Sequence, residues 1–138
     1  MSKKTPPNLL TAPIGLVQST MHQLAVKKGW WPMLTNMSLT TKQKREQVEA
    51  TVPEKLALIH SEVSEALEEF RNNKRLNEVT FGEDDEEEKP EGFPVELADV
   101  VIRVFDLAQA LNIDLGYWIA RKYEYNASRK KRHGGKRA

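Results

Sequence analysis

The chain has 138 residues, of which 39% are hydrophobic and 30% charged, so its length suits one modest hydrophobic core. It has no cysteine, which excludes disulfides and thiolate metal sites. No apolar run approaches the roughly 18 residues of a membrane span, and the N-terminal segment lacks the apolar stretch of a secretory signal. We therefore expect a single domain in the cytoplasm that has no contact with membranes.

Helical periodicity dominates the chain, and little of it alternates as strands do. Gly29 is expected to end the first helix, and Thr51 with Glu54 has the spacing of a capping box at the start of the second. Pro94 suits the first turn of the third helix, and Asp114 suits the N-cap of the fourth. We predict an all-α domain with helices over 14–28, 51–72, 94–112 and 115–128, a flexible N-terminus (1–12), a polar connector (33–50) with at most a short surface helix, an acidic loop (74–92) and a basic tail (129–138).

Two of the predicted helices carry acidic residues at helical spacing, i and i+3 or i+7, which places them on one face of each helix. The third helix is otherwise apolar over most of its surface, so its polar stripe requires an explanation. The two sets are Glu62, Glu65 and Glu69 in the second helix, and Glu96, Asp99, Arg103 and Asp106 in the third.

Carboxylates at the edge of a packed helix pair repel one another and lose solvation, so they need a counter-charge. Mg²⁺ would supply it, because this cation prefers oxygen ligands. The alternative is an ordinary solvated face, in which Arg103 forms a salt bridge with Asp99 or Asp106. Two acid pairs on two apolar helices that a loop makes antiparallel favour the metal site.

The last predicted helix carries a polar stripe of the opposite character. Lys122, Asn126 and Arg129 stand at i, i+4 and i+7 and therefore share one face. Arg binds phosphate oxygens in a bidentate fork, whereas Lys acts as a mobile point charge. The stripe is consistent with a phosphate ligand, and the alternative is the exposed end of an amphipathic helix.

The acid pattern E62-V-S-E65 followed by E96-L-A-D99, with the tail K122-Y-E-Y-N126-A-S-R129 and H133-G-G-K136, resembles the all-α nucleoside triphosphate pyrophosphatases. The similarity is to their MazG-like branch, including small phage-encoded members, and it extends from about residue 14 to the C-terminus. One departure is the spacer of thirty residues between Glu65 and Glu96, which is longer than is typical of the family.

The resemblance implies a four-helix MazG-like bundle, assembled as a dimer or tetramer, in the cytoplasm of the host if a phage encodes it. It implies hydrolysis of a nucleoside or deoxynucleoside triphosphate between the α- and β-phosphates, with dGTP or another purine nucleotide as a candidate substrate. Mg²⁺, or Mn²⁺ in its place, would be held by four carboxylates and would activate the attacking water. The implied ligands are Glu62, Glu65, Glu96 and Asp99, with Glu62 or Glu65 as the general base.

The resemblance also assigns substrate contacts. It places Lys122, Asn126 and Arg129 on the substrate, and His133 and Lys136 are candidates for a lid over the phosphates. Trp30 and Trp31 leave the first helix together, and either can be a core anchor or can stack on the nucleobase. His22 and Gln23 precede them by about two turns and could reach an edge of the base, although a single His is more often structural.

Two other functions fit parts of the sequence. A nucleic-acid-binding module would use the basic tail, but it leaves the acid stripes unexplained and is therefore disfavoured. A helical interaction protein would use the apolar third helix as an oligomer interface, and this is compatible with the hydrolase.

Overall fold

The computed structural model describes residues 8–72, 75–82 and 88–129. Within them the chain is mostly helical, which confirms the all-α prediction. None of these helices is both long enough and apolar enough to cross a membrane. The elements are α1 (Asn8–Lys27), α2 (Pro32–Thr35), α3 (Thr41–Ala50), α4 (Val52–Arg71), β1 (Thr80–Phe81), β2 (Pro90–Glu91), α5 (Phe93–Ala110) and α6 (Leu115–Ser128).

The four predicted helices correspond to α1, α4, α5 and α6. The Asp114 carboxylate accepts a hydrogen bond from the Tyr117 backbone N–H at 3.0 Å, which confirms the predicted N-cap of α6. Gly29 follows the end of α1, as expected. However, α1 begins at Asn8, so residues 8–12 of the predicted flexible N-terminus are helical, and residues 1–7 lie outside the described residues.

The capping box lies at a different helix from the one predicted. Thr51 has helical backbone angles, and its hydroxyl donates to the Val48 carbonyl at 2.7 Å. Thr40 and Gln43 form the reciprocal pair instead: the Gln43 N–H donates to Thr40 Oγ1, and the Thr40 N–H donates to Gln43 Oε1. The segment predicted as a connector therefore contains a full helix, α3, which leads into α4 with only Thr51 between them.

The acidic segment between α4 and α5 carries a short antiparallel ladder rather than only a loop. Thr80 pairs with Glu91 and Phe81 with Pro90. Most of the acidic residues of this segment fall at 83–87, outside the described residues.

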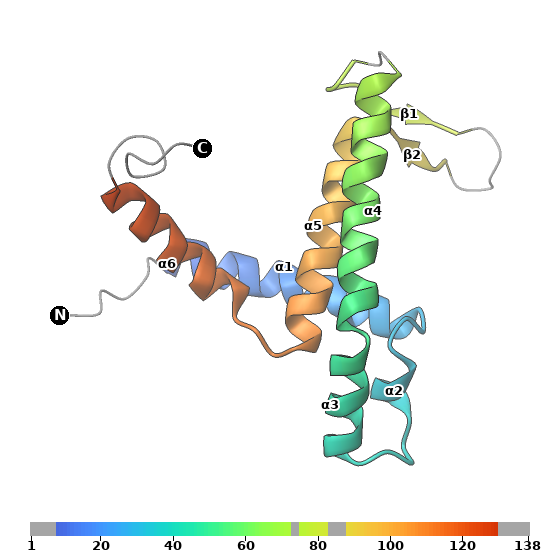
Figure 1. The fold of residues 1–138 in the computed structure, drawn as a ribbon, viewed down its shortest axis with the longest axis vertical. Helices are drawn as coiled ribbons and strands as arrows, with labels where there is room; N and C mark the ends of the chain where they lie inside the picture. The colour runs from blue at the N-terminus through green and yellow to red at the C-terminus, as the bar shows by residue number, and fades with distance from the viewer. Residues whose placement is uncertain (1–7, 73–74, 83–87, 130–138) are drawn as a thin grey trace.

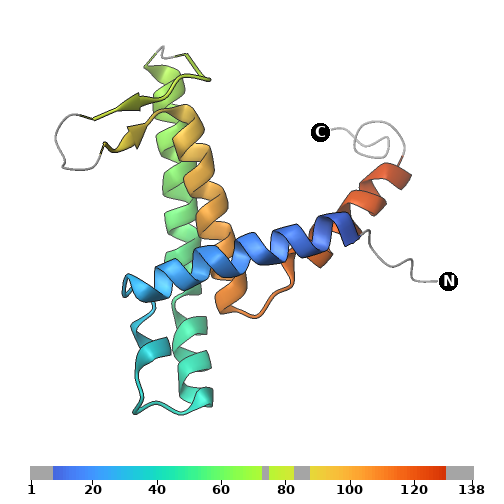
Figure 2. The same ribbon diagram turned by 180° about the vertical axis from the view of Figure 1, so that it is seen from behind.

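The helices form two units that meet at α1 (Figures 1 and 2). Helices α4 and α5 run antiparallel side by side, and α3 continues below α4. Helix α1 crosses α5, and α6 lies along α1, pointing away from the α4–α5 pair. A single chain is therefore more open than a four-helix bundle.

A buried cluster joins these elements at the lower end of α5. It consists of Ala25, Trp31, Val48 and Leu107, which come from α1, the start of α2, α3 and α5. Trp31 is fully buried, with 0% of its surface exposed. This single large side chain therefore fixes α1 and α2 against α5.

Gly116 lets α6 approach α1 closely. A Cβ atom at this position would lie 2.9 Å from the Thr11 carbonyl oxygen and 3.1 Å from the Thr11 Cα. Both are backbone atoms, so a larger residue would push the two helices apart. Beyond this contact the side chains of α6 are largely exposed, and Trp118 and Tyr123 are 59% and 62% exposed.

Candidate metal and nucleotide site

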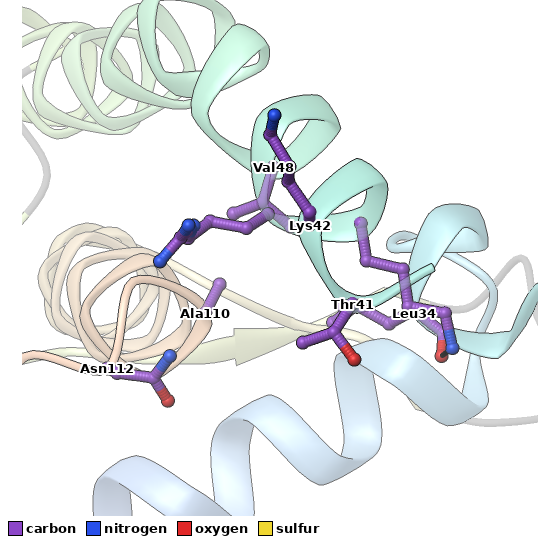
Figure 3. A pocket seen from close by; sticks show the side chains of 8 residues that line it. Leu34, Thr41, Lys42, Val48, Ala110 and Asn112 are labelled. Carbon is purple, nitrogen blue, oxygen red and sulfur yellow. Dashed lines mark hydrogen bonds between the residues drawn. The ribbon is translucent and has the colours of Figure 1, made fainter. Parts of the chain in front are cut away.

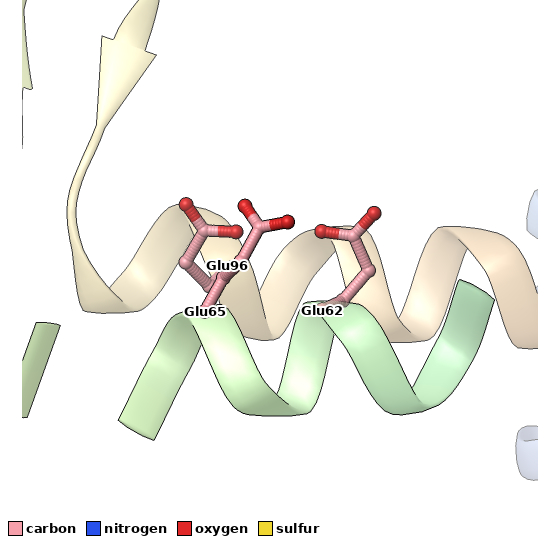
Figure 4. Close-up of side chains that lie close together, drawn as sticks. All are labelled: Glu62, Glu65 and Glu96. Carbon is pink, nitrogen blue, oxygen red and sulfur yellow. The ribbon is translucent and has the colours of Figure 1, made fainter. Parts of the chain in front are cut away.

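Three of the four predicted metal-binding carboxylates meet across the α4–α5 pair. Glu62 and Glu65 come from α4 and Glu96 from α5, and all three point to the same side (Figure 4). One oxygen atom of each lies within 4.8 Å of the others. Glu62 is buried, Glu96 partly buried and Glu65 exposed, so the cluster opens to solvent on one side.

The position of Glu96 depends on the glycine that precedes α5. Gly92 is the N-cap of this helix and has a φ of +137°, which side-chain-bearing residues rarely adopt. A Cβ atom there would lie 2.6 Å from the Glu78 carbonyl oxygen. The Glu96 N–H donates to the Gly92 carbonyl at 3.2 Å, so this glycine sets the first turn of α5 and with it the position of Glu96 beside α4.

Arg103 neutralises only one of these carboxylates. Its Nε donates to Glu62 Oε1 in a close ion pair across the two helices. Among the described residues, Arg103 forms no ion pair with Asp99 or with Asp106, which were the alternatives expected from the sequence. Asp99 lies outside the three-carboxylate group, and its side chain lines a neighbouring cavity instead.

Burial and the neighbouring carboxylates raise the pKa values of two acids. The pKa of Glu96 is raised above its usual range first by burial and then by the neighbouring Glu65, Asp99, Glu62 and Glu69. The pKa of Asp99 is raised by burial and by Glu62, and Arg103 opposes this shift. The ionised cluster therefore favours any cation that can reach it.

The cluster fits Mg²⁺ by chemistry and by spacing. All its donors are carboxylate oxygens, the hard ligands that this cation prefers. Opposite ligands of Mg²⁺ stand about 4.2 Å apart, given its ligand distances of about 2.1 Å. The three oxygens lie within 4.8 Å of one another, so small side-chain rotations would bring them to bonding distance.

A cavity of about 630 Å³ lies beside the cluster, between α1, α4 and α5. Asp99 and Arg103 line it at the side of the carboxylates, and Trp30 and Lys55 line it as well. Its apolar wall includes Met21, Leu24, Ala25, Leu58 and Ile102. The volume lies in the range of small-molecule binding sites.

The two adjacent tryptophans have different roles. Trp30 is 59% exposed and lines this cavity, so its indole can reach a ligand. Trp31 is buried, and its Nε1 donates to both oxygens of Asp106 at 2.9 and 3.0 Å. Trp31 is therefore a core anchor, and its buried indole cannot contact a substrate.

His22 belongs with Trp31 rather than with the cavity. Its Nδ1 lies 2.7 Å from Asp106 Oδ1, and its ring packs edge-on to the Trp31 ring with centroids 5.7 Å apart. The side chain is only 14% exposed. Gln23 is exposed on α1, and neither residue lines the cavity, so the structure does not bring the predicted base-edge contacts to it.

The predicted phosphate-binding residues of α6 are not brought to the acid cluster within one chain. Lys122, Asn126 and Arg129 are all exposed, and the two cations lie over the Tyr125 ring at 4.8 and 5.5 Å from its centroid. Because α6 packs on α1, the stripe stands on the arm that points away from α4 and α5 (Figure 1). His133 and Lys136 lie outside the described residues.

Lys55 is the residue of this region that the sequence reasoning missed. Its Nζ lies 4.2 Å from the centroid of the Trp31 ring and donates to the Trp30 carbonyl at 3.4 Å. It thus ties α4 to both tryptophans and places a cation on the cavity wall. The signal was present, because Lys55, Glu62 and Glu69 recur every seven residues and so share a face of α4.

Comparison of the chain with models of known protein families, with curated proteins and with solved structures finds no match.

Proposed function

We propose that this protein is a Mg²⁺-dependent nucleoside triphosphate pyrophosphohydrolase of the MazG-like type. It would cleave between the α- and β-phosphates and act on the (deoxy)nucleoside triphosphate pool, with dGTP as a candidate substrate. The observation that carries the proposal is the meeting of Glu62, Glu65 and Glu96 across two helices. The E-x-x-E and E-x-x-D motifs of the resemblance contain these three residues together with Asp99, and a cavity of nucleotide size adjoins them.

The carboxylates would have different roles in metal binding and proton transfer, according to their surroundings. Glu62, Glu65 and Glu96, with Asp99 one turn along α5, would hold Mg²⁺ or Mn²⁺, which would neutralise charge on the phosphate oxygens. Glu62 already accepts a hydrogen bond from Arg103. Glu65 is exposed and has no ion pair among the described residues, so we assign it the role of general base.

The cavity would hold the nucleoside. Trp30 offers an exposed indole for stacking, an interaction worth roughly 1–3 kcal/mol per base. The apolar wall on α1 and α4 would exclude water from the base. Lys55 and Arg103 also line the cavity and would offer positive charge to the phosphates.

A second copy of the chain would complete the site, as a dimer or tetramer. The apolar residues of α4 and α5 that flank the carboxylates remain about half exposed in one chain, and so do the aromatic residues of α6. They are Val63, Leu67, Phe70, Leu97 and Val101 beside the cluster and Trp118, Tyr123 and Tyr125 on α6. A MazG-like four-helix arrangement between two copies would cover this surface and bring Lys122, Asn126 and Arg129 of one copy to the acids of the other.

The central test is an assay of all canonical NTPs and dNTPs with Mg²⁺, monitoring monophosphate and pyrophosphate. We expect Glu65→Gln and Asp99→Asn each to lower kcat by about 100-fold or more, whereas Glu68→Gln should leave it unchanged. Glu68 is the matched control, because it lies on α4 in an exposed ion pair with Arg71. Turnover that survives both site substitutions would refute the assignment, and release of orthophosphate with a diphosphate would move the cleavage to the β–γ bond.

The assembly is tested by subunit complementation. Glu65→Gln and Arg129→Ala should each be inactive alone, whereas a refolded mixture should recover a substantial part of the activity through hybrid oligomers. A mixture that stays as inactive as its components would contradict a shared site. Salt-sensitive DNA binding that persists in Glu65→Gln and is lost on deletion of residues 129–138 would instead favour the nucleic-acid-binding function.

A further inference from the structure

A second cavity, of about 500 Å³, lies at the other end of the α4–α5 pair. It is enclosed by α2, α3 and the C-terminal end of α5 (Figure 3). It shares no lining residue with the cavity beside Trp30, and the proposed hydrolysis does not use it. Its volume nevertheless lies in the range of small-molecule sites.

The inner wall of this cavity is apolar. Leu34 of α2, Val48 of α3 and Ala110 of α5 contribute it. Val48 is only 2% exposed and belongs to the buried cluster that joins α1, α3 and α5. The wall is therefore a fixed part of the core, able to accept an apolar or flat group without rearrangement.

The rim of the cavity is cationic. Lys42, Lys44 and Arg45 line it, and no carboxylate does. Lys42 lies 3.7 Å from Glu46, but both side chains are mostly exposed, so this pair is weak. Lys44 donates to the Leu34 carbonyl at 3.3 Å, which holds its ammonium group where α2 meets α3.

Two further features favour an anion here. No ion pair involves Arg45 within residues 8–72, 75–82 and 88–129, so its guanidinium group is available for a bidentate contact. Thr41 and Asn112 add a hydroxyl and an amide to the lining, at the first turn of α3 and just beyond the end of α5. Thr41 is the first residue of α3, and the positive end of this helix's dipole favours an anion there.

We propose that this cavity is a second binding site, for a phosphate ester with an apolar or heteroaromatic body. Three cations suit a dianionic phosphate group, and the wall of Leu34, Val48 and Ala110 suits the body. A nucleoside monophosphate has this chemistry, and so does a phosphorylated metabolite of another kind. The proposal does not depend on the hydrolase activity, because the two cavities are separate.

The test is calorimetric titration of the full chain in metal-free buffer with three probes: 2′-deoxyguanosine 5′-monophosphate, glucose 6-phosphate and inorganic phosphate. We expect the nucleotide to bind at least ten-fold more tightly than inorganic phosphate. The combined Lys44→Ala and Arg45→Ala variant should lose at least ten-fold in affinity. The matched control combines Lys27→Ala and Lys28→Ala, two exposed lysines outside both cavities, and should bind as the unaltered chain does.

A second variant tests the wall independently of the charges. Ala110→Leu narrows the cavity and should weaken nucleotide binding while leaving the weaker binding of inorganic phosphate unchanged; circular dichroism checks that it folds. Tighter binding of glucose 6-phosphate than of the nucleotide would identify a sugar phosphate as the ligand. It would refute the proposal that the ligand carries an apolar or heteroaromatic group. Equal affinity for all three probes, or nucleotide binding lost in Trp30→Ala but not in the Lys44 and Arg45 variant, would overturn the site.

Discussion

Helix α5 places carboxylates in two contrasting settings at its two ends. Near its C-terminal end the buried Asp106 accepts hydrogen bonds from Trp31 Nε1 and lies 2.7 Å from His22 Nδ1, so its own chain provides its partners. Near its N-terminal end Glu96 faces Glu62 and Glu65, and burial together with these neighbours raises its pKa. The first arrangement is complete without a ligand, whereas a cation would stabilise the second.

This contrast separates structural acids from candidate functional ones more sharply than burial does. Asp106 and Glu62 are almost equally buried, at 9% and 6% exposure. What differs is the partner: neutral donors and an imidazole for Asp106, against other carboxylates and one guanidinium for Glu62. On α5, substitution of Asp106 should therefore destabilise the fold, whereas substitution of Asp99 should not.

The largest effect is expected from Asp106→Asn compared with Asp99→Asn. An amide at position 106 turns one acceptor into a donor that faces the Trp31 N–H, which should cost about 2 kcal/mol of unfolding free energy. Asp99→Asn, the matched change about two turns earlier on the same helix, should cost nothing, because the raised pKa of Asp99 marks an unfavourable charge. Urea unfolding midpoints measure both, and equal losses would contradict the distinction.

The next effect is stabilisation by the metal. Mg²⁺ at ten times its dissociation constant should raise the unfolding free energy by about 1.4 kcal/mol, since it binds only the folded cluster. The rise should persist in Asp106→Asn and disappear in Glu65→Gln. Thermal unfolding measures it, with NaCl at equal ionic strength as the control. An equal rise with NaCl would show general screening rather than a site.

The sequence predicted those parts of the molecule that local periodicity determines. The face shared by Glu62 and Glu65, and the N-cap at Asp114, follow from spacing and from a single favourable residue type. The capping box was misplaced because Thr51–Glu54 and Thr40–Gln43 have the same local spacing. Only the course of the backbone through Thr51 decides between them.

Local sequence patterns could not predict the different roles of the adjacent residues Trp30 and Trp31, or the direction of α6. Trp30 and Trp31 differ in burial because Asp106, 75 positions from Trp31, provides the acceptor for one indole only. The direction of α6 likewise depends on its contact through Gly116 with Thr11, at the opposite end of the chain. Both are tertiary contacts, and no periodicity within one helix specifies them.

The smallest expected effect is also the most specific, and it concerns Glu96→Gln. In metal-free buffer at pH 7 this change removes a charge that faces Glu65, Asp99 and Glu62, so it should stabilise the fold by about 0.5 kcal/mol, or roughly 2 °C in Tm. The folded-state pKa of Glu96 is raised above its ordinary 4.5, so the native protein takes up this proton at a higher pH than the unfolded chain does. The stabilisation that the variant gains is therefore full above the raised pKa and fades as the pH falls through it and below 4.5, because the native carboxyl then becomes protonated and loses its charge.

Saturating Mg²⁺ should reverse the sign of the same comparison. The metal would stabilise the unaltered chain through Glu96 and would bind the Glu96→Gln variant more weakly, so the variant would become the less stable protein. Thermal unfolding of the two proteins at pH 7 and near pH 4.5, each with and without Mg²⁺, measures all four differences. Glu68→Gln, on the exposed face of α4, should show neither the gain nor the reversal. A gain in metal-free buffer that Mg²⁺ leaves untouched would mean that the carboxylates repel one another without forming a cation site, because only a ligand shared by Glu62, Glu65 and Glu96 couples the charge at position 96 to the metal.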